Sequence, residues 1–157
     1  MRRSIIPSVA VAVLVFSAFG AERPSFSKKD VLNAIAAFRT DPLSDLGRLG
    51  GGLVMAYVKT SPDVMVRLTP KVFPIFGKEN TLSDDEFATL LAAYDAGSAG
   101  SQLKRNKIGD DSYAGDLQLI ETYKFLQRRN PKLKVTGIEK LIELDRSGRL
   151  KQYVSSP

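Results

Sequence analysis

The stretch 83–107, SDDEFATLLAAYDAGSAGSQLKRNK, decides the fold of this chain. Ser83 stands three residues before Glu86, which is the spacing of an N-terminal capping box, and the acids lie where a helix dipole favours them. Apolar side chains then recur with the period of a helix, at Phe87, Leu90, Leu91 and Tyr94. The stretch therefore predicts one long helix that ends near Lys107.

Small residues occupy one side of this predicted helix, at Ala93, Gly97 and Gly100. A stripe of this kind lets a neighbouring helix approach closely. A second small-residue run, Gly50–Gly52, interrupts the apolar pattern of residues 43–59, and three glycines in a helix interior cost roughly 2–3 kcal/mol relative to alanines. We expect either a helix break at Gly50–Gly52 or a close backbone contact there. Both small-residue runs are equally consistent with packing inside one chain and with association between chains.

The remaining segments are also helical in pattern. Ser27 with Asp30, and Thr136 with Glu139, match the capping box, and Asp41 before Pro42 is typical of a helix start. The predicted helices span about 28–39, 42–59, 83–107, 112–129 and 136–147, followed by a short turn after Gly148. Three prolines make residues 60–79 irregular. The sequence predicts an all-α fold, a single compact bundle of about five helices over residues 21–157.

The N-terminus has the pattern of a cleavable secretory signal peptide at residues 1–20. Two arginines precede the charge-free apolar run Ile5–Phe19, and small residues at Ala18 and Gly20 offer a cleavage site. Fifteen apolar residues are fewer than the about 20 that cross a bilayer, so a signal is favoured over the alternative of an uncleaved anchor. We therefore expect a periplasmic or secreted protein.

Three absences limit the chemistry of the 157-residue chain, which has no Cys, no His and no Trp. Without Cys there is no disulfide and no thiolate nucleophile. Without His there is no Ser-His-Asp triad and no histidine-ligated metal. Asp110, Asp111 and Asp116 lack the spacing of a calcium loop. The sequence accordingly predicts no metal site and no cofactor.

Two catalytic patterns remain as alternatives. Ser101 and Lys104 match S-x-x-K, in which a lysine one helical turn away activates a serine, but the companion motifs of such enzymes are missing. Glu121 and Asp111 are the carboxylates that could serve a hydrolase of envelope polymers. The latter pair requires that the two carboxyl groups converge in one cleft.

The net charge of +6 is unevenly distributed along the chain. Residues 21–100 are nearly neutral, whereas residues 101–157 carry 12 basic and 7 acidic side chains. The candidate binding residues in this basic half are Lys104, Arg105, Tyr113, Lys124, Arg128 and Arg129. The basic clusters end successive helices, so antiparallel packing would place them at opposite ends of the bundle.

These observations favour a non-catalytic binding or interaction module of the cell envelope. Its basic half suits anionic polymers or lipid headgroups as partners, because opposite charge attracts such surfaces. Export makes nucleic acid an unfavoured target. The alternative is the small hydrolase described above, and the sequence leaves the oligomeric state open.

Overall fold

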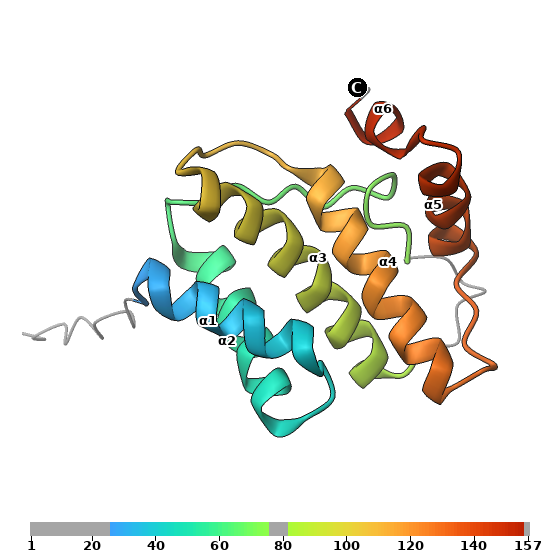
Figure 1. Cartoon of the computed structure of the whole chain (residues 1–157), viewed down its shortest axis with the longest axis horizontal. Coiled ribbons are helices and arrows are strands. Elements are labelled where there is room, and N and C mark those ends of the chain that lie inside the picture. The colour runs from blue at the N-terminus through green and yellow to red at the C-terminus, as the bar shows by residue number, and fades with distance from the viewer. Residues whose placement is uncertain (1–25, 76–81, 156–157) are drawn as a thin grey trace, which may run out of the picture.

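The computed structural model describes residues 26–75 and 82–155, and over these ranges the protein is all-helical with no strand (Figure 1). The helices are α1 (Lys28–Thr40), α2 (Asp45–Thr60), α3 (Asp84–Arg105), α4 (Ser112–Arg129), α5 (Thr136–Arg146) and α6 (Leu150–Ser155). The predicted all-α bundle of about five helices is confirmed. The sixth helix is short and replaces the turn expected after Gly148. The predicted signal peptide lies outside the described residues.

Side-chain caps explain where four of the helices begin, α1 to α4. Ser27 and Ser83 form the predicted capping boxes of α1 and α3. The predicted start of the second helix at Asp41 and Pro42 is wrong, because Ser44 caps α2. Asp41 instead ends α1, and its carboxylate accepts the amide of Leu43 (3.0 Å).

The predicted capping box at Thr136 is also wrong. Val135 is the N-cap of α5, and no side chain caps this helix. The carboxylate of Glu139 accepts a hydrogen bond from the Tyr123 hydroxyl (2.7 Å) and another from the Gln127 amide (3.0 Å). The Glu139 carboxylate, which the local pattern assigned to the cap of α5, therefore accepts hydrogen bonds from side chains of α4 instead.

The run Gly50–Gly52 does not break α2, which continues from Asp45 to Thr60. A Cβ atom on Gly50 would lie 2.5 Å from the carbonyl oxygen of Ala34, and one on Gly51 would lie 3.1 Å from the ring of Phe38. Glycine at these two positions lets α2 approach the backbone of α1. Of the two outcomes expected for the glycine run, the structure shows the close approach.

Helix α3 forms the centre of the molecule, and every residue from Ala92 to Gly100 is buried. Its one side packs with α1 and α2, and its other side packs with α4 (Figure 1). Two clusters of buried apolar side chains result. One is built on α1, α2 and α3, whereas the other joins α3 and α4 to α5, α6 and the irregular residues 72–75. The C-terminal helices thus complete the second cluster.

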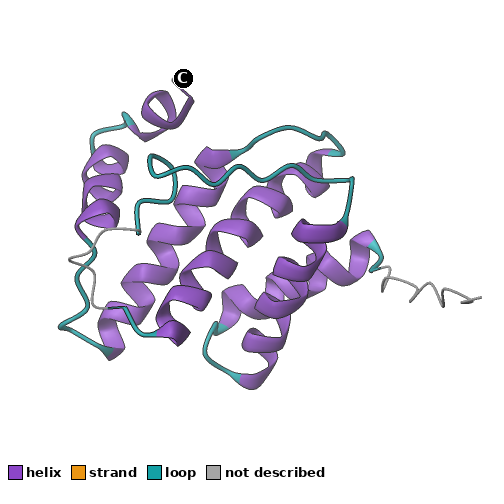
Figure 2. Ribbon diagram, turned by 180° about the vertical axis from the view of Figure 1, so that it is seen from behind, coloured by secondary structure: helices purple, strands orange, loops and turns teal. Residues whose placement is uncertain are grey.

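The irregular segment of residues 61–75 crosses α3 on the face seen in Figure 2. Gln102, which is 1% exposed, holds this segment to α3. Its amide group donates to the carbonyl of Met65 (2.7 Å), and its oxygen accepts the amides of Met65 (2.9 Å) and Gly109 (3.1 Å). The irregular structure predicted for residues 60–79 is confirmed from Ser61 to Ile75, and residues 76–79 lie outside the described ranges.

We expect Gln102→Ala to destabilise the protein by about 3 kcal/mol, because it removes three part-buried hydrogen bonds that join α3 to the backbone of Met65 and Gly109. Denaturant unfolding measures the loss. Hydrogen exchange should show faster exchange at those two amides, with the interior amides of α1 unchanged. Unchanged exchange at Met65 and Gly109 would show that Gln102 does not hold the segment.

Candidate functional site

A surface pocket of about 630 Å³ lies at the end of the α3–α4 pair where these helices are joined. Four separate parts of the chain line it: the irregular segment, the end of α3, the start of α4 with the preceding loop, and α6. The lining residues are Arg67, Ser101, Arg105, Asp110, Asp111, Ser112, Tyr113, Lys151, Val154 and Ser155. We call this the α3/α4/α6 pocket.

Asp111 organises one wall of the pocket. One of its carboxylate oxygens accepts the hydroxyl of Ser101 (2.6 Å) and the guanidinium of Arg105 (2.6 Å). The other accepts the amide of Ala114 (3.2 Å) and so caps α4. Both oxygens are therefore engaged by the protein, and Asp111 ties the end of α3 to the start of α4.

Asp110 is similarly held by its neighbours. Its carboxylate accepts the hydroxyl of Ser112 (2.9 Å), and the Arg67 guanidinium lies 3.9 Å away. The Arg67 side chain remains 64% exposed, so this ion pair is a weak one. Both acids of the pocket thus have partners within the protein.

The cations opposite these acids keep free donors. The ammonium of Lys151 lies 6.0 Å from the centre of the Tyr113 ring and forms no ion pair or hydrogen bond with the described residues. Arg67 has only its weak contact with Asp110. Arg105 uses its Nε and one terminal nitrogen and is still about half exposed. The free hydrogen-bonding capacity of the pocket is therefore mostly that of cationic donors.

A buried carboxylate lies one helical turn beyond Ser112. Asp116 is fully buried, and neither of its oxygens has a hydrogen-bond partner. Burial, with a further contribution from the charge of Asp110, raises the pKa of Asp116 to about 8. At neutral pH this carboxyl is mostly protonated. It therefore adds little negative charge beneath the pocket.

Tyr94 from α3 lies in the same region. Its hydroxyl donates to the carbonyl of Arg67 (2.9 Å), which joins the irregular segment to α3. Burial raises the pKa of Tyr94, and the carboxylates of Asp116, Asp110 and Asp95 raise it further. Asp95 is a second buried acid, 5% exposed, and burial raises its pKa to about 7. Both carboxyls are unusual in a core, where acids are normally paired.

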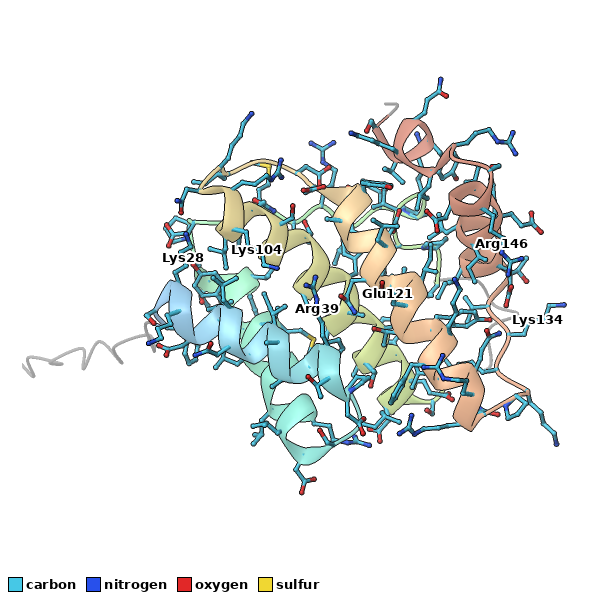
Figure 3. The ribbon with its side chains drawn as sticks, in the orientation of Figure 1. Lys28, Arg39, Lys104, Glu121, Lys134 and Arg146 are labelled. Carbon is cyan, nitrogen blue, oxygen red and sulfur yellow. The ribbon has the colours of Figure 1, made fainter. Side chains whose placement is uncertain are left out.

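The structure brings together only two of the six predicted binding residues, Arg105 and Tyr113. Gly100 faces Ile35 of α1, and Lys104 stands one helical turn after Gly100. Lys104 therefore lies on the side of α3 nearer to α1 (Figure 3). The other three lie near the far end of α4. Because a helix rises 1.5 Å per residue, Arg128 is about 22 Å from Tyr113 along α4.

The basic residues at the far end of α4 are engaged with neighbours. The guanidinium of Arg129 stacks 3.9 Å from the centre of the Phe125 ring and lies 3.7 Å from the Asp41 carboxylate. Arg128 lies 5.6 Å from the same ring, and Lys124 is half-buried. Arg128 also lines a small pocket of about 170 Å³ with Arg39 and Glu121. These cations do not form one patch with Arg105.

The arrangement of the candidate catalytic groups does not favour hydrolysis. Asp111 and Glu121 stand ten residues apart on one helix axis, about 15 Å, whereas a glycosidase needs its two carboxyl groups about 5–9.5 Å apart. Glu121 is exposed, not shielded by the core. The hydroxyl of Ser101 donates to Asp111, and Lys104 does not line the pocket that Ser101 shares. Neither pair gathers in a cleft.

Sequence reasoning missed Arg67 and Lys151. Arg67 stands alone in an irregular segment, and Lys151 belongs to a helix of six residues. No local spacing relates either of them to Arg105, which is 38 residues from one and 46 from the other. Only the packing of the irregular segment and α6 around the α3–α4 end brings them together.

Three further findings bear on this site. Within residues 26–75 and 82–155, no group of three or more His, Cys, Asp or Glu side chains gathers where a metal ion could bind. None of the helices in those ranges combines the length and apolar character of a membrane span. No protein-family model, curated protein or solved structure matches this chain.

Proposed function

We propose that this protein is an exported, non-catalytic binding module whose α3/α4/α6 pocket binds an anionic group of a cell-envelope component. The observation that carries the proposal is the convergence of Arg67, Arg105 and Lys151, from three distant parts of the chain, on one pocket. The anionic group is a phosphate or carboxylate, as found on envelope polymers and on lipid headgroups.

The hydrogen bonds already made by the two acids of the pocket support an anionic ligand over a cationic one. Asp110 and Asp111 lie in the pocket, but their oxygens already accept hydrogen bonds from Ser112, Ser101, Arg105 and the start of α4. A ligand cation would have to replace these donors. A ligand anion meets the unpaired ammonium of Lys151 and the exposed guanidinium of Arg67, which can bind a phosphate or carboxylate in a bidentate manner.

The Tyr113 ring supports binding of a group larger than an inorganic ion. It stands beside Lys151 at the pocket wall, and its half-buried face offers apolar contact next to the cation. A pocket of about 630 Å³ falls in the size range of sites for small molecules and for single units of a polymer. The proposed ligand is therefore a charged group attached to a ring or chain.

The combined variant Arg67→Glu and Lys151→Glu should weaken binding to anionic probes by about tenfold or more, which corresponds to about 1.4 kcal/mol. The probes are heparin and vesicles containing phosphatidylglycerol, and equilibrium binding is measured at low and high salt. Binding should fall as salt rises, because salt screens exposed charges. Heparin alone would indicate a polymer ligand, and vesicles alone a lipid headgroup.

The matched control is Arg128→Glu with Arg129→Glu, which changes the net charge by the same amount at the far end of α4. We expect this control to reduce binding by less than about threefold, as a long-range charge effect. Equal losses in the two variants would show general electrostatic attraction and no pocket. Absence of binding by the wild-type chain to both probes would overturn the proposal.

A further inference from the structure

One side of α2 is left uncovered by the residues that the structure describes. The helix packs on α1 and α3, and its opposite side faces solvent. Leu46 and Leu49 lie on this uncovered side with 68% and 72% of their surface exposed, the two most exposed of the large apolar residues in the described ranges. Exposed leucines on neighbouring turns are unfavourable in water and are typical of a surface that another molecule covers.

The middle of this face is shaped for close contact with a helix. Gly52 and Ala56 are both exposed and stand one turn apart. A Cβ atom built on Gly52 would meet nothing within 4 Å, so no group of the described residues uses the space above it. Leu49, Gly52 and Leu53, with Asp45 and Arg48, line a hollow of about 610 Å³. A second helix can therefore approach α2 most closely at Gly52.

The charges on the same face indicate what kind of helix fits. Asp45 and Lys59 stand seven residues before and seven residues after Gly52, and a seven-residue step returns to the same side of a helix. Neither side chain forms an ion pair or hydrogen bond with the described residues. A second α2 that crosses at Gly52 in the antiparallel direction would place each Asp45 opposite the partner's Lys59. The face is thus complementary to itself.

We propose that the protein forms a symmetric dimer through α2, with the two-fold axis passing beside Gly52. A two-fold interface buries the same surface on both copies, and here it covers Leu46 and Leu49 of each chain and forms two equivalent ion pairs. One helix pair buries less surface than a standard stable interface, so the dimer is weak and concentration-dependent. The run Gly50–Gly52 is consistent with association between two chains. In this dimer only Gly52 makes that contact, because Gly50 and Gly51 face α1 of their own chain.

Introduced cysteines test the position and direction of the contact, since the full chain has none of its own. Gly52→Cys should form a disulfide-linked dimer rapidly under mild oxidation, because residues at the axis fall within the about 7 Å Cα–Cα limit of a disulfide. Asp45→Cys should not, since the two copies of residue 45 are about 21 Å apart in an antiparallel pair. Ile108→Cys, which is exposed and lies outside α2, gives the rate of random collision.

Sedimentation of the full chain from about 1 μM to about 1 mM tests the chemistry of the contact. Leu49→Glu should leave a folded monomer at all concentrations, because the side chain is exposed in the single chain. Asp45→Lys should weaken the dimer about tenfold, and adding Lys59→Asp should restore it because the charges are exchanged. Ile108→Glu should dimerise as the wild type does.

Three outcomes would overturn the proposal. A wild-type chain that remains monomeric throughout, with Gly52→Cys reacting no faster than Ile108→Cys, excludes a second copy as the occupant. Rapid linkage through both Asp45→Cys and Gly52→Cys indicates a parallel contact. A dimer that Leu49→Glu leaves intact uses another surface.

Discussion

Asp116→Asn should stabilise the protein at alkaline pH by several kcal/mol, a large gain from a single substitution. Asp116 is fully buried without a hydrogen-bond partner, and its pKa is raised to about 8. In the unfolded chain an aspartate has a pKa of about 3.9. At a pH between these two pKa values, Asp116 holds a proton in the folded state that it has released in the unfolded state.

The direction of the pH dependence follows from that difference. Stability changes with pH in proportion to the protons bound by the unfolded state minus those bound by the folded state, which is negative here. The free energy of unfolding therefore falls as pH rises from about 4 to about 8, and the loss is complete above the folded pKa. At 1.36 kcal/mol per pKa unit, the upper bound for this group is about 6 kcal/mol.

Denaturant unfolding at pH 5, 7 and 9 checks this expectation. The wild-type chain should be most stable at the lowest of these values, and Asp95, with its pKa raised to about 7, acts in the same direction. Asp116→Asn should show a smaller pH dependence and exceed the wild type at pH 9. Exposed Glu143→Gln is the control and should follow the wild type. An Asn variant less stable than wild type at pH 9 would contradict a buried, unpartnered carboxylate.

Gly97→Ala should destabilise the protein by about 3 kcal/mol, although alanine is the better helix former. A Cβ atom at this position would collide with the carbonyl oxygen of Ala114 and would lie 2.8 Å from the Cβ of Gln118. The first of these atoms belongs to the backbone of α4 and cannot move alone. The helices α3 and α4 would have to separate along their contact.

Gly52→Ala is the matched control, because it makes the same substitution inside a helix with open space around the new atom. It should stabilise the monomer by up to about 1 kcal/mol through helix propensity. Denaturant unfolding at low protein concentration measures both variants. If both stabilise the protein, the α3–α4 contact is not as close as the structure has it.

Local sequence patterns correctly predicted the helix starts that depend only on residues close together in the chain. Ser27 and Ser83 cap α1 and α3 because each finds its acidic partner three residues later on the same chain. The same spacing at Thr136 failed, since Tyr123 of α4 takes the carboxylate of Glu139. For the pocket, Arg105 and Tyr113 could be selected from the basic half of the chain. Arg67 and Lys151 could not, because no spacing in the sequence relates them to it.

The stretch 83–107 by itself determined that a long helix would form there, since its capping box and apolar period act within a few residues. The missing cysteines and histidines likewise excluded whole classes of chemistry without any structure. Tertiary structure alone decided that Asp116 is buried and that Gly97 faces α4 whereas Gly52 faces solvent. These properties depend on what neighbouring helices cover, and burial is set by contacts between residues far apart in the chain.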